Sequence, residues 1–68
     1  MMEVNKLYKH SKCIDVAFSP SRIKRLGGGL VMLGYWWRIG NNTVPQLLAE
    51  ETIAIGNMDE DQWELYEE

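Results

Sequence analysis

The chain has 68 residues, 46% of them hydrophobic, and a formal net charge of −3. We expect a single domain over residues 1–68, because this length allows only one small core. Cys13 is the only cysteine, which excludes an intrachain disulfide. The longest uncharged apolar run, residues 27–37, has about half the length of a membrane-spanning helix. With no signal-peptide pattern at the start, we expect a cytoplasmic protein without a membrane partner.

The first predicted strands are short. Residues 4–10 have a mixed pattern that indicates a strand. Residues 13–18, CIDVAF, alternate in hydropathy, which predicts a half-buried strand with Ile14, Val16 and Phe18 facing the core.

Residues 19–26, SPSRIKRL, fit two structures. Ser19 as N-cap, Pro20 at the first helical position and Gly27 as a stop predict a two-turn helix. A bulge at Ser19–Pro20, a continuing strand and a glycine turn predict a hairpin, which we favour.

Centring this hairpin on Gly28 sets its register. Ile23 then lies opposite Leu33, and Leu26 lies opposite Leu30. These apolar pairs are the kind that stabilises an antiparallel sheet.

The second strand of the hairpin, residues 30–39, contains the adjacent tryptophans Trp36 and Trp37. Neighbouring side chains on a strand point to opposite faces. The even face is interrupted by Gly34 and ends in Arg38, whereas the odd face is apolar throughout. We therefore predict that Trp37 fills the core and that Trp36 lies outside.

Residues 40–51, GNNTVPQLLAEE, predict a turn and an extended loop that carries Pro45. A short strand follows at residues 51–55, with Ile53 and Ile55 facing inward.

The last residues, 57–66, again fit two structures. Asn57 as a cap with acids in the first turn predicts a short helical turn, followed by a terminal strand with Trp63 and Leu65 inward. The alternative is a two-turn helix that ends at Tyr66.

These elements predict a mainly β fold: a small SH3-like five-stranded barrel with a short helical turn near the C-terminus. Closing the sheet would cover both apolar faces and leave few free edges. An open sheet with one packed helix is the alternative.

Three stretches, LYKHSKCIDVAF, YWWRIG and ETIAI…WELY, resemble small uncharacterised phage- or prophage-type proteins. The resemblance implies a phage genomic setting and says nothing of activity. By analogy, it favours a protein that binds a component of the host.

No pattern in the chain indicates catalysis, a metal or a cofactor, so we expect a protein that is not an enzyme. His10 and Cys13 lack two further ligands for a metal, and residues three apart on a strand face opposite sides. The stretch RLGGGL lacks the Lys-Ser/Thr of a phosphate-binding loop. A pocket around His10 or Cys13 is the enzymatic alternative.

One group of residues is a candidate partner-binding surface, because tryptophan, methionine and arginine are enriched at interface centres. In the predicted register one side of the hairpin carries Arg22, Lys24, Met32, Trp36 and Arg38. A cation–π contact within the fold would give the same set a purely structural role.

The charge distribution suggests two further surfaces. The first 38 residues hold all seven basic residues and two acids, whereas the last 30 hold eight acids. The acidic end could pack on the basic half of its own chain, bind a basic partner, or meet a second copy.

We therefore expect a non-enzymatic protein-interaction module, a phage-type protein that binds a host factor through the Trp36 side or the acidic terminus. One alternative is nucleic-acid binding by the basic N-terminal half, with a base stacked on Trp36. The other is a self-assembling structural protein, that is, a homo-oligomer.

Overall fold

The structure, a computed structural model, describes residues 2–40 and 44–66. Its strands form one antiparallel sheet in the order β4-β3-β2-β1-β5, with a 3-10 helix, η1, before the last strand. In chain order the elements are β1 (Tyr8–His10), β2 (Val16–Leu26), β3 (Gly29–Arg38), β4 (Gln46–Gly56), η1 (Asn57–Gln62) and β5 (Trp63–Leu65).

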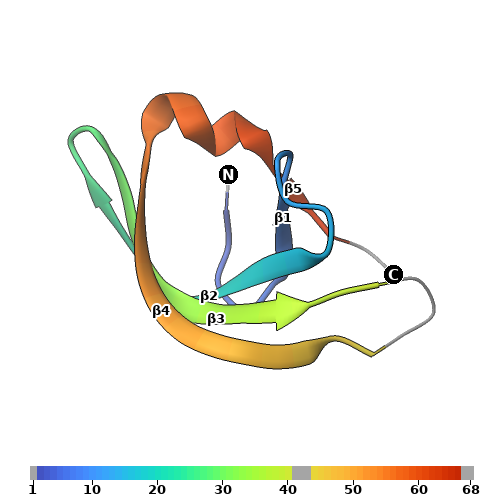
Figure 1. The fold of residues 1–68 in the computed structure, drawn as a ribbon. Coiled ribbons are helices and arrows are strands. Elements are labelled where there is room, and N and C mark those ends of the chain that lie inside the picture. The colour runs from blue at the N-terminus through green and yellow to red at the C-terminus, as the bar shows by residue number, and fades with distance from the viewer. Residues whose placement is uncertain (1, 41–43, 67–68) are drawn as a thin grey trace.

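The mainly β prediction is confirmed, as are five strands and a helical turn near the C-terminus. The sheet curves into a trough, with the N-terminal segment inside and η1 across its open side (Figure 1). Within residues 2–40 and 44–66, β4 and β5 are the two edges of the sheet and do not pair with each other. Strand pairing therefore does not close the sheet into a barrel.

The hairpin interpretation of residues 19–26 is confirmed, because β2 continues as a strand to Leu26. Its register with β3 shifts between Pro20 and Arg22, which leaves Ser21 as the extra residue of a bulge. The Ser21 hydroxyl donates a hydrogen bond to the Leu33 carbonyl (3.0 Å). The bulge thus lies next to the predicted position.

The predicted register of this hairpin is wrong by one residue. Ile23 pairs with Met32, and Leu26 pairs with Gly29, so the turn is a two-residue turn on Gly27–Gly28. A slip of one residue moves every side chain of one strand to the other face of the sheet.

The core lies on the concave face of the sheet. It is formed by buried residues from the N-terminal segment and three strands, with partly buried apolar residues packed around them. The buried members are Met2, Tyr8, Phe18, Leu30 and Met32, and the partly buried ones are Ile23, Trp36, Ile53, Ile55 and Trp63. The inward predictions for Phe18, Ile53, Ile55 and Trp63 are confirmed.

The predicted faces of the two tryptophans are reversed. Trp36 packs on the core, whereas Trp37 lies on the opposite, convex face. Gly34 explains the difference: a Cβ there would lie 2.2 Å from the Ser19 carbonyl oxygen and 2.9 Å from the Phe18 ring. Gly34 therefore lies on the buried face of β3, where the absence of a side chain lets β2 approach. The prediction that this glycine indicates a face exposed to solvent is wrong.

Other predictions in the first half of the chain need correction. Ile14 is 85% exposed in the bend before β2, so its inward prediction is wrong. The strand expected over residues 4–10 is limited to β1, and the preceding residues form a turn.

The second half also differs in detail. β4 begins at Gln46, where an extended loop was expected. The N-cap of η1 is Gly56, not Asn57, and Leu65 is exposed on β5. The predicted turn at residues 41–43 lies outside the described residues.

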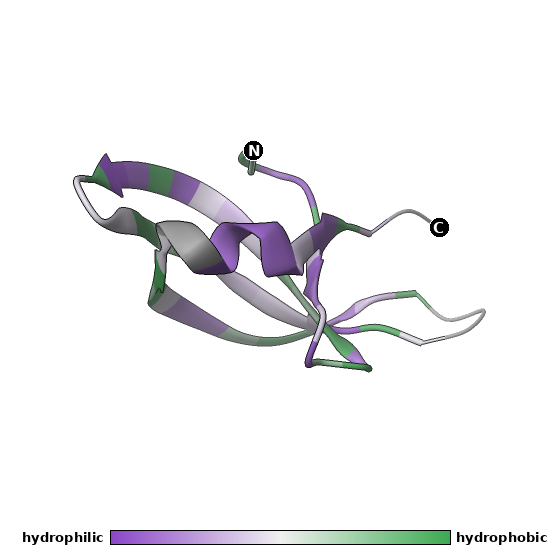
Figure 2. Ribbon diagram, turned by 90° about the horizontal axis from the view of Figure 1, so that it is seen from above, coloured by the Kyte–Doolittle hydropathy of each residue, from purple (hydrophilic) through white to green (hydrophobic). Residues whose placement is uncertain are grey.

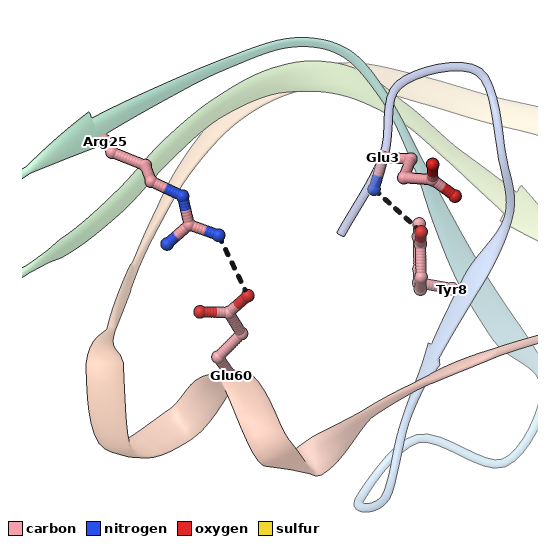
Figure 3. Close-up of polar contacts among 4 residues, drawn as sticks. All are labelled: Glu3, Tyr8, Arg25 and Glu60. Carbon is pink, nitrogen blue, oxygen red and sulfur yellow. Dashed lines mark hydrogen bonds and ion pairs between the residues drawn. The ribbon is translucent and has the colours of Figure 1, made fainter. Parts of the chain in front are cut away.

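Two polar contacts attach the ends of the chain to the sheet (Figure 3). The Glu3 backbone N–H donates to the Tyr8 hydroxyl (2.7 Å), and Arg25 of β2 donates to the Glu60 carboxylate of η1 (3.3 Å). η1 is hydrophilic along much of its length (Figure 2). In the part of the chain that is described, no helix is long and apolar enough to cross a bilayer.

Candidate functional site

The five residues predicted to form a partner-binding surface lie on two faces of the sheet. Arg22 pairs with Leu33 and Lys24 with Val31, which places both basic side chains on the convex face. Met32 and Trp36 belong to the concave core, and Met32 is 0% exposed. The one-residue register difference separates the predicted group, and Met32 does not reach the surface.

Trp36 is held in a cluster of aromatic rings. Its ring centroid lies 5.0 Å from that of Phe18 and 6.2 Å from that of Trp63, and Trp63 meets His10 edge-on at 4.9 Å. The Trp36 indole N–H donates to the Glu51 carboxylate of β4 (3.0 Å). Trp36 thus packs the core and positions an acidic side chain on β4.

The convex face carries a half-buried apolar row along β3, which we call the outer stripe: Val31, Leu33, Tyr35 and Trp37. Arg22 and Lys24 of β2 flank it on one side. Glu50 of β4 pairs with Tyr35 on the other side. No described segment covers this face in Figure 1. Charges of opposite sign therefore border the stripe.

Two indole N–H groups have no acceptor among the described residues. Those of Trp37 and Trp63 are both buried. A buried donor without a partner costs about 1–3 kcal/mol. Because both nitrogens are inaccessible, they offer nothing to a ligand and weaken the fold instead.

The free edge of β4 is the most exposed apolar element of the sheet. Every residue from Gln46 to Thr52 is exposed, and Leu47 is 58% exposed. The register with β3 shifts at Leu48, and pairing is regular from Ala49 to Gly56. Only β3 pairs with β4 among the described residues, so the backbone groups along its outer edge are unpaired.

The first half of this edge strand, residues 46–50, was missed in the sequence because Pro45 and the polar residues before it indicated a loop, whereas the strand over residues 51–55 was predicted. Residues 49–55 do alternate along the chain, with Glu51, Ile53 and Ile55 on one face. This alternation was the signal in the sequence that could have indicated a longer strand. The sequence pattern does not tell which strand lies at the edge of the sheet.

His10 is the last residue of β1, and Cys13 lies in the connection between β1 and β2. A groove of about 230 Å³ lies beside them, lined also by Lys9, Ser11, Ile14 and Glu64. The His10 Nδ1 accepts a hydrogen bond from the Lys12 backbone N–H (3.1 Å), so this nitrogen is occupied within the turn. No group of three potential metal ligands occurs in the described ranges.

The glycine turn opens onto a second groove, of about 370 Å³. Its lining is almost entirely apolar side chains and glycine backbone, including Leu26, Leu30 and Ile55. Neither Gly27 nor Gly28 has a positive φ. With no polar side chain in its lining, the groove has no group to orient a small ligand.

No family model matches the chain, and no curated protein or solved structure matches it either. The resemblance to phage-type proteins therefore stays a prediction. The residues of β4 and the convex face are the basis for a functional proposal.

Proposed function

We propose that this protein is a non-enzymatic protein-interaction module and that the free edge of β4 is its binding surface. The observation that carries the proposal is an 11-residue edge strand with exposed Leu47 and Leu48. In keeping with the phage-type resemblance, the partner would be a host protein in the cytoplasm.

An exposed sheet edge is suited to binding because it combines two kinds of interaction. Its unpaired N–H and C=O groups give main-chain hydrogen bonds to an added strand, and side-chain contacts beside it give specificity. Natural proteins blunt long edges with charges and bulges, and β4 has both at Glu50, Glu51 and Leu48. The regular part, Ala49–Gly56, is still long enough for a partner strand.

Some of the residues predicted to bind a partner lie next to the free edge of β4. Arg38 pairs with Gln46 at the start of β4, and Trp36 positions Glu51. Arg22 and Lys24 lie across the outer stripe and would extend the surface on the convex face. Met32 would contribute only by supporting the core.

We also propose that the curved sheet has the arrangement of an SH3-like barrel that is left open between β4 and β5. The pairing of β1 with both β2 and β5 supports it, because the first and last strands then lie together at one side. The helical turn η1 between β4 and β5 and the strong curvature of the sheet support it as well (Figure 1).

Site-specific photo-crosslinking tests the binding surface. A benzophenone amino acid would replace Leu47, which is exposed and is not a member of the core cluster, and the protein would be irradiated in a nuclease-treated host lysate. The matched control places the same group at Ile14, which is more exposed but lies on the turn before β2. We expect a discrete cross-linked protein from position 47 alone.

That product should disappear when Leu48→Lys is added, with circular dichroism showing an unchanged fold. Equal labelling from positions 47 and 14, or no product from position 47, would contradict a binding surface on β4.

Nucleic-acid binding is the second candidate, supported by exposed Arg22 and Lys24 beside the aliphatic part of the outer stripe, which continues along β3 into Tyr35 and Trp37. Glu50, on the same face, opposes it. Binding of single-stranded DNA should then weaken steeply with added salt, because phosphate contacts release counterions. No mobility shift at low salt would eliminate this candidate.

A further inference from the structure

The free edge of β4 has a defined order of side chains. In its regular part the concave face carries Ile55, Ile53 and Glu51, which are paired with Leu30, Met32 and Gly34 of β3. The convex face carries Ala54, Thr52 and Glu50 in the same way. Each face of the edge is therefore neutral near Gly56 and acidic towards Ala49.

A second copy of β4 is a poor occupant of this edge. The strand runs from Gln46 to Gly56, so Glu51 is its middle residue. Antiparallel pairing of two copies about that centre places Glu51 of one chain opposite Glu51 of the other, and each Glu50 opposite Thr52. Like charges opposite each other in a sheet are destabilising, so Glu51 disfavours this edge-to-edge self-assembly.

The basic strand of the same chain is not available either. Arg22, Lys24 and Arg25 belong to β2, and β3 lies between β2 and β4. These residues pair with β3 on one side of β2, whereas β1 pairs with β2 only at Phe18. The complementary charge for the edge of β4 must therefore come from another chain.

We propose that β4 binds an extended, basic segment of a partner protein by antiparallel strand addition. This inference rests on the proposed function and specifies its partner. Antiparallel pairing continues the pattern of the whole sheet and is slightly more stable per residue than parallel pairing. Apolar partner residues lie beside Ile55 and Ile53, and two consecutive basic residues lie beside Glu51 and Glu50.

The recognised pattern follows from the direction of the added strand. Read from its N-terminus, the segment passes Ile55 first and Glu50 last. The order is apolar, any, apolar, any, basic, basic. Alternation places both apolar side chains and the first basic one on the concave face, and the second basic one beside Glu50 on the convex face.

Three capped peptides test this pattern: SVTVTKKS, its acidic counterpart SVTVTEES, and SVPVPKKS, in which prolines remove backbone donors but retain the charge. Amide hydrogen exchange of the full chain reports protection along Ala49–Gly56, and titration gives the dissociation constants. Glu50→Lys is the test variant. Asp61→Lys, an equal charge change on η1, is its matched control.

We expect SVTVTKKS to protect β4 and to bind at least about tenfold more tightly than SVTVTEES or SVPVPKKS. Glu50→Lys should abolish the preference between the basic and acidic peptides, because Glu51 remains acidic, whereas Asp61→Lys should retain it. Comparable binding of SVPVPKKS would show that charge alone acts, which overturns strand addition.

The remaining outcomes separate the two proposals. Equal protection of β4 by the basic and acidic peptides overturns the basic partner but leaves β4 as a protein-binding edge. No protection by any peptide at about 1 mM, an affinity too weak for recognition, overturns strand addition altogether. The cross-link from position 47 then decides the proposed function independently.

Discussion

Gly34 occupies the closest approach between β2 and β3. A Cβ at this position would lie 2.2 Å from the Ser19 carbonyl oxygen and 2.8 Å from Pro20 Cα, both backbone atoms of a buried bend. We expect Gly34→Ala to lower the free energy of unfolding by about 3 kcal/mol, because backbone must move to admit the methyl group. Urea denaturation measures the change.

Gly28→Ala is the matched control, because a Cβ there meets nothing within 4 Å and the residue has no positive φ. Its effect should stay within about 0.5 kcal/mol. A similar loss in both variants would mean that the close contact at Gly34 does not exist.

The adjacent tryptophans give a second test at the scale of single residues. Trp36→Phe removes the hydrogen bond to Glu51 and part of the packing on Phe18 and Trp63. We expect a loss of roughly 1–3 kcal/mol. Trp37→Phe removes a buried N–H that has no acceptor, so its cost should be smaller than that of Trp36→Phe.

Urea unfolding of the two variants gives the ranking, with near-ultraviolet circular dichroism as a check on the native packing. The reverse ranking would return Trp37 to the core and Trp36 to the outside. The same geometry implies that Trp36→Ala unfolds much of the protein, since a domain of this size is marginally stable.

At the scale of elements, an ion pair connects η1 to the hairpin. Arg25 of β2 meets Glu60 of η1 at 3.3 Å, with side chains 50% and 18% exposed (Figure 3). Partly exposed pairs contribute little because solvent screens them. A double-mutant cycle with Arg25→Ala and Glu60→Ala should give a coupling of about 0.2–1 kcal/mol that decreases with salt.

A coupling near zero at low salt would mean that this ion pair does not hold η1 against the sheet. A value that does not change with salt would identify a contact other than the ion pair.

At the scale of the whole molecule, folding brings the two oppositely charged halves of the sequence together. Basic β1 lies beside acidic β5, where Lys9 pairs directly with Glu64. Acidic β4 forms the far edge, next to β3 and one strand away from basic β2. The charge polarity of the sequence is thus partly neutralised within the fold.

We therefore expect stability to decrease with ionic strength. Raising NaCl from about 20 mM to 500 mM shortens the screening length from roughly 20 Å to a few ångströms. The free energy of unfolding should fall by roughly 1 kcal/mol, measured from urea midpoints. Glu64→Gln should reduce this salt dependence; an increase in stability with salt would contradict the attraction between the halves.

The candidate site was only partly predictable. Arg22, Lys24 and Arg38 are exposed as expected, but the group they formed with Met32 and Trp36 depended on a register that was wrong by one residue. In a strand pair, that shift exchanges the faces of all side chains on one strand. A local pattern with apolar residues on both faces does not contain enough information to choose between the two registers.

The sequence by itself determined most of the strand pattern, although it indicated a loop for the first half of β4. Apolar residues over Val16–Leu26 and Gly29–Arg38, separated by glycines, favour a hairpin, and the acids after Asn57 favour a helical turn before a last strand. These features depend on neighbouring residues only, through backbone preference and side-chain period.

The tertiary structure decided which face is buried and which edge is free. Trp36 became the core tryptophan because Gly34, which has no side chain, lets Phe18 and the bulge of β2 pack close to β3. Gly34 and Phe18 are about 16 positions apart in the sequence. β4 became an open edge because β5 pairs with β1. Such choices depend on long-range packing, which no local pattern encodes.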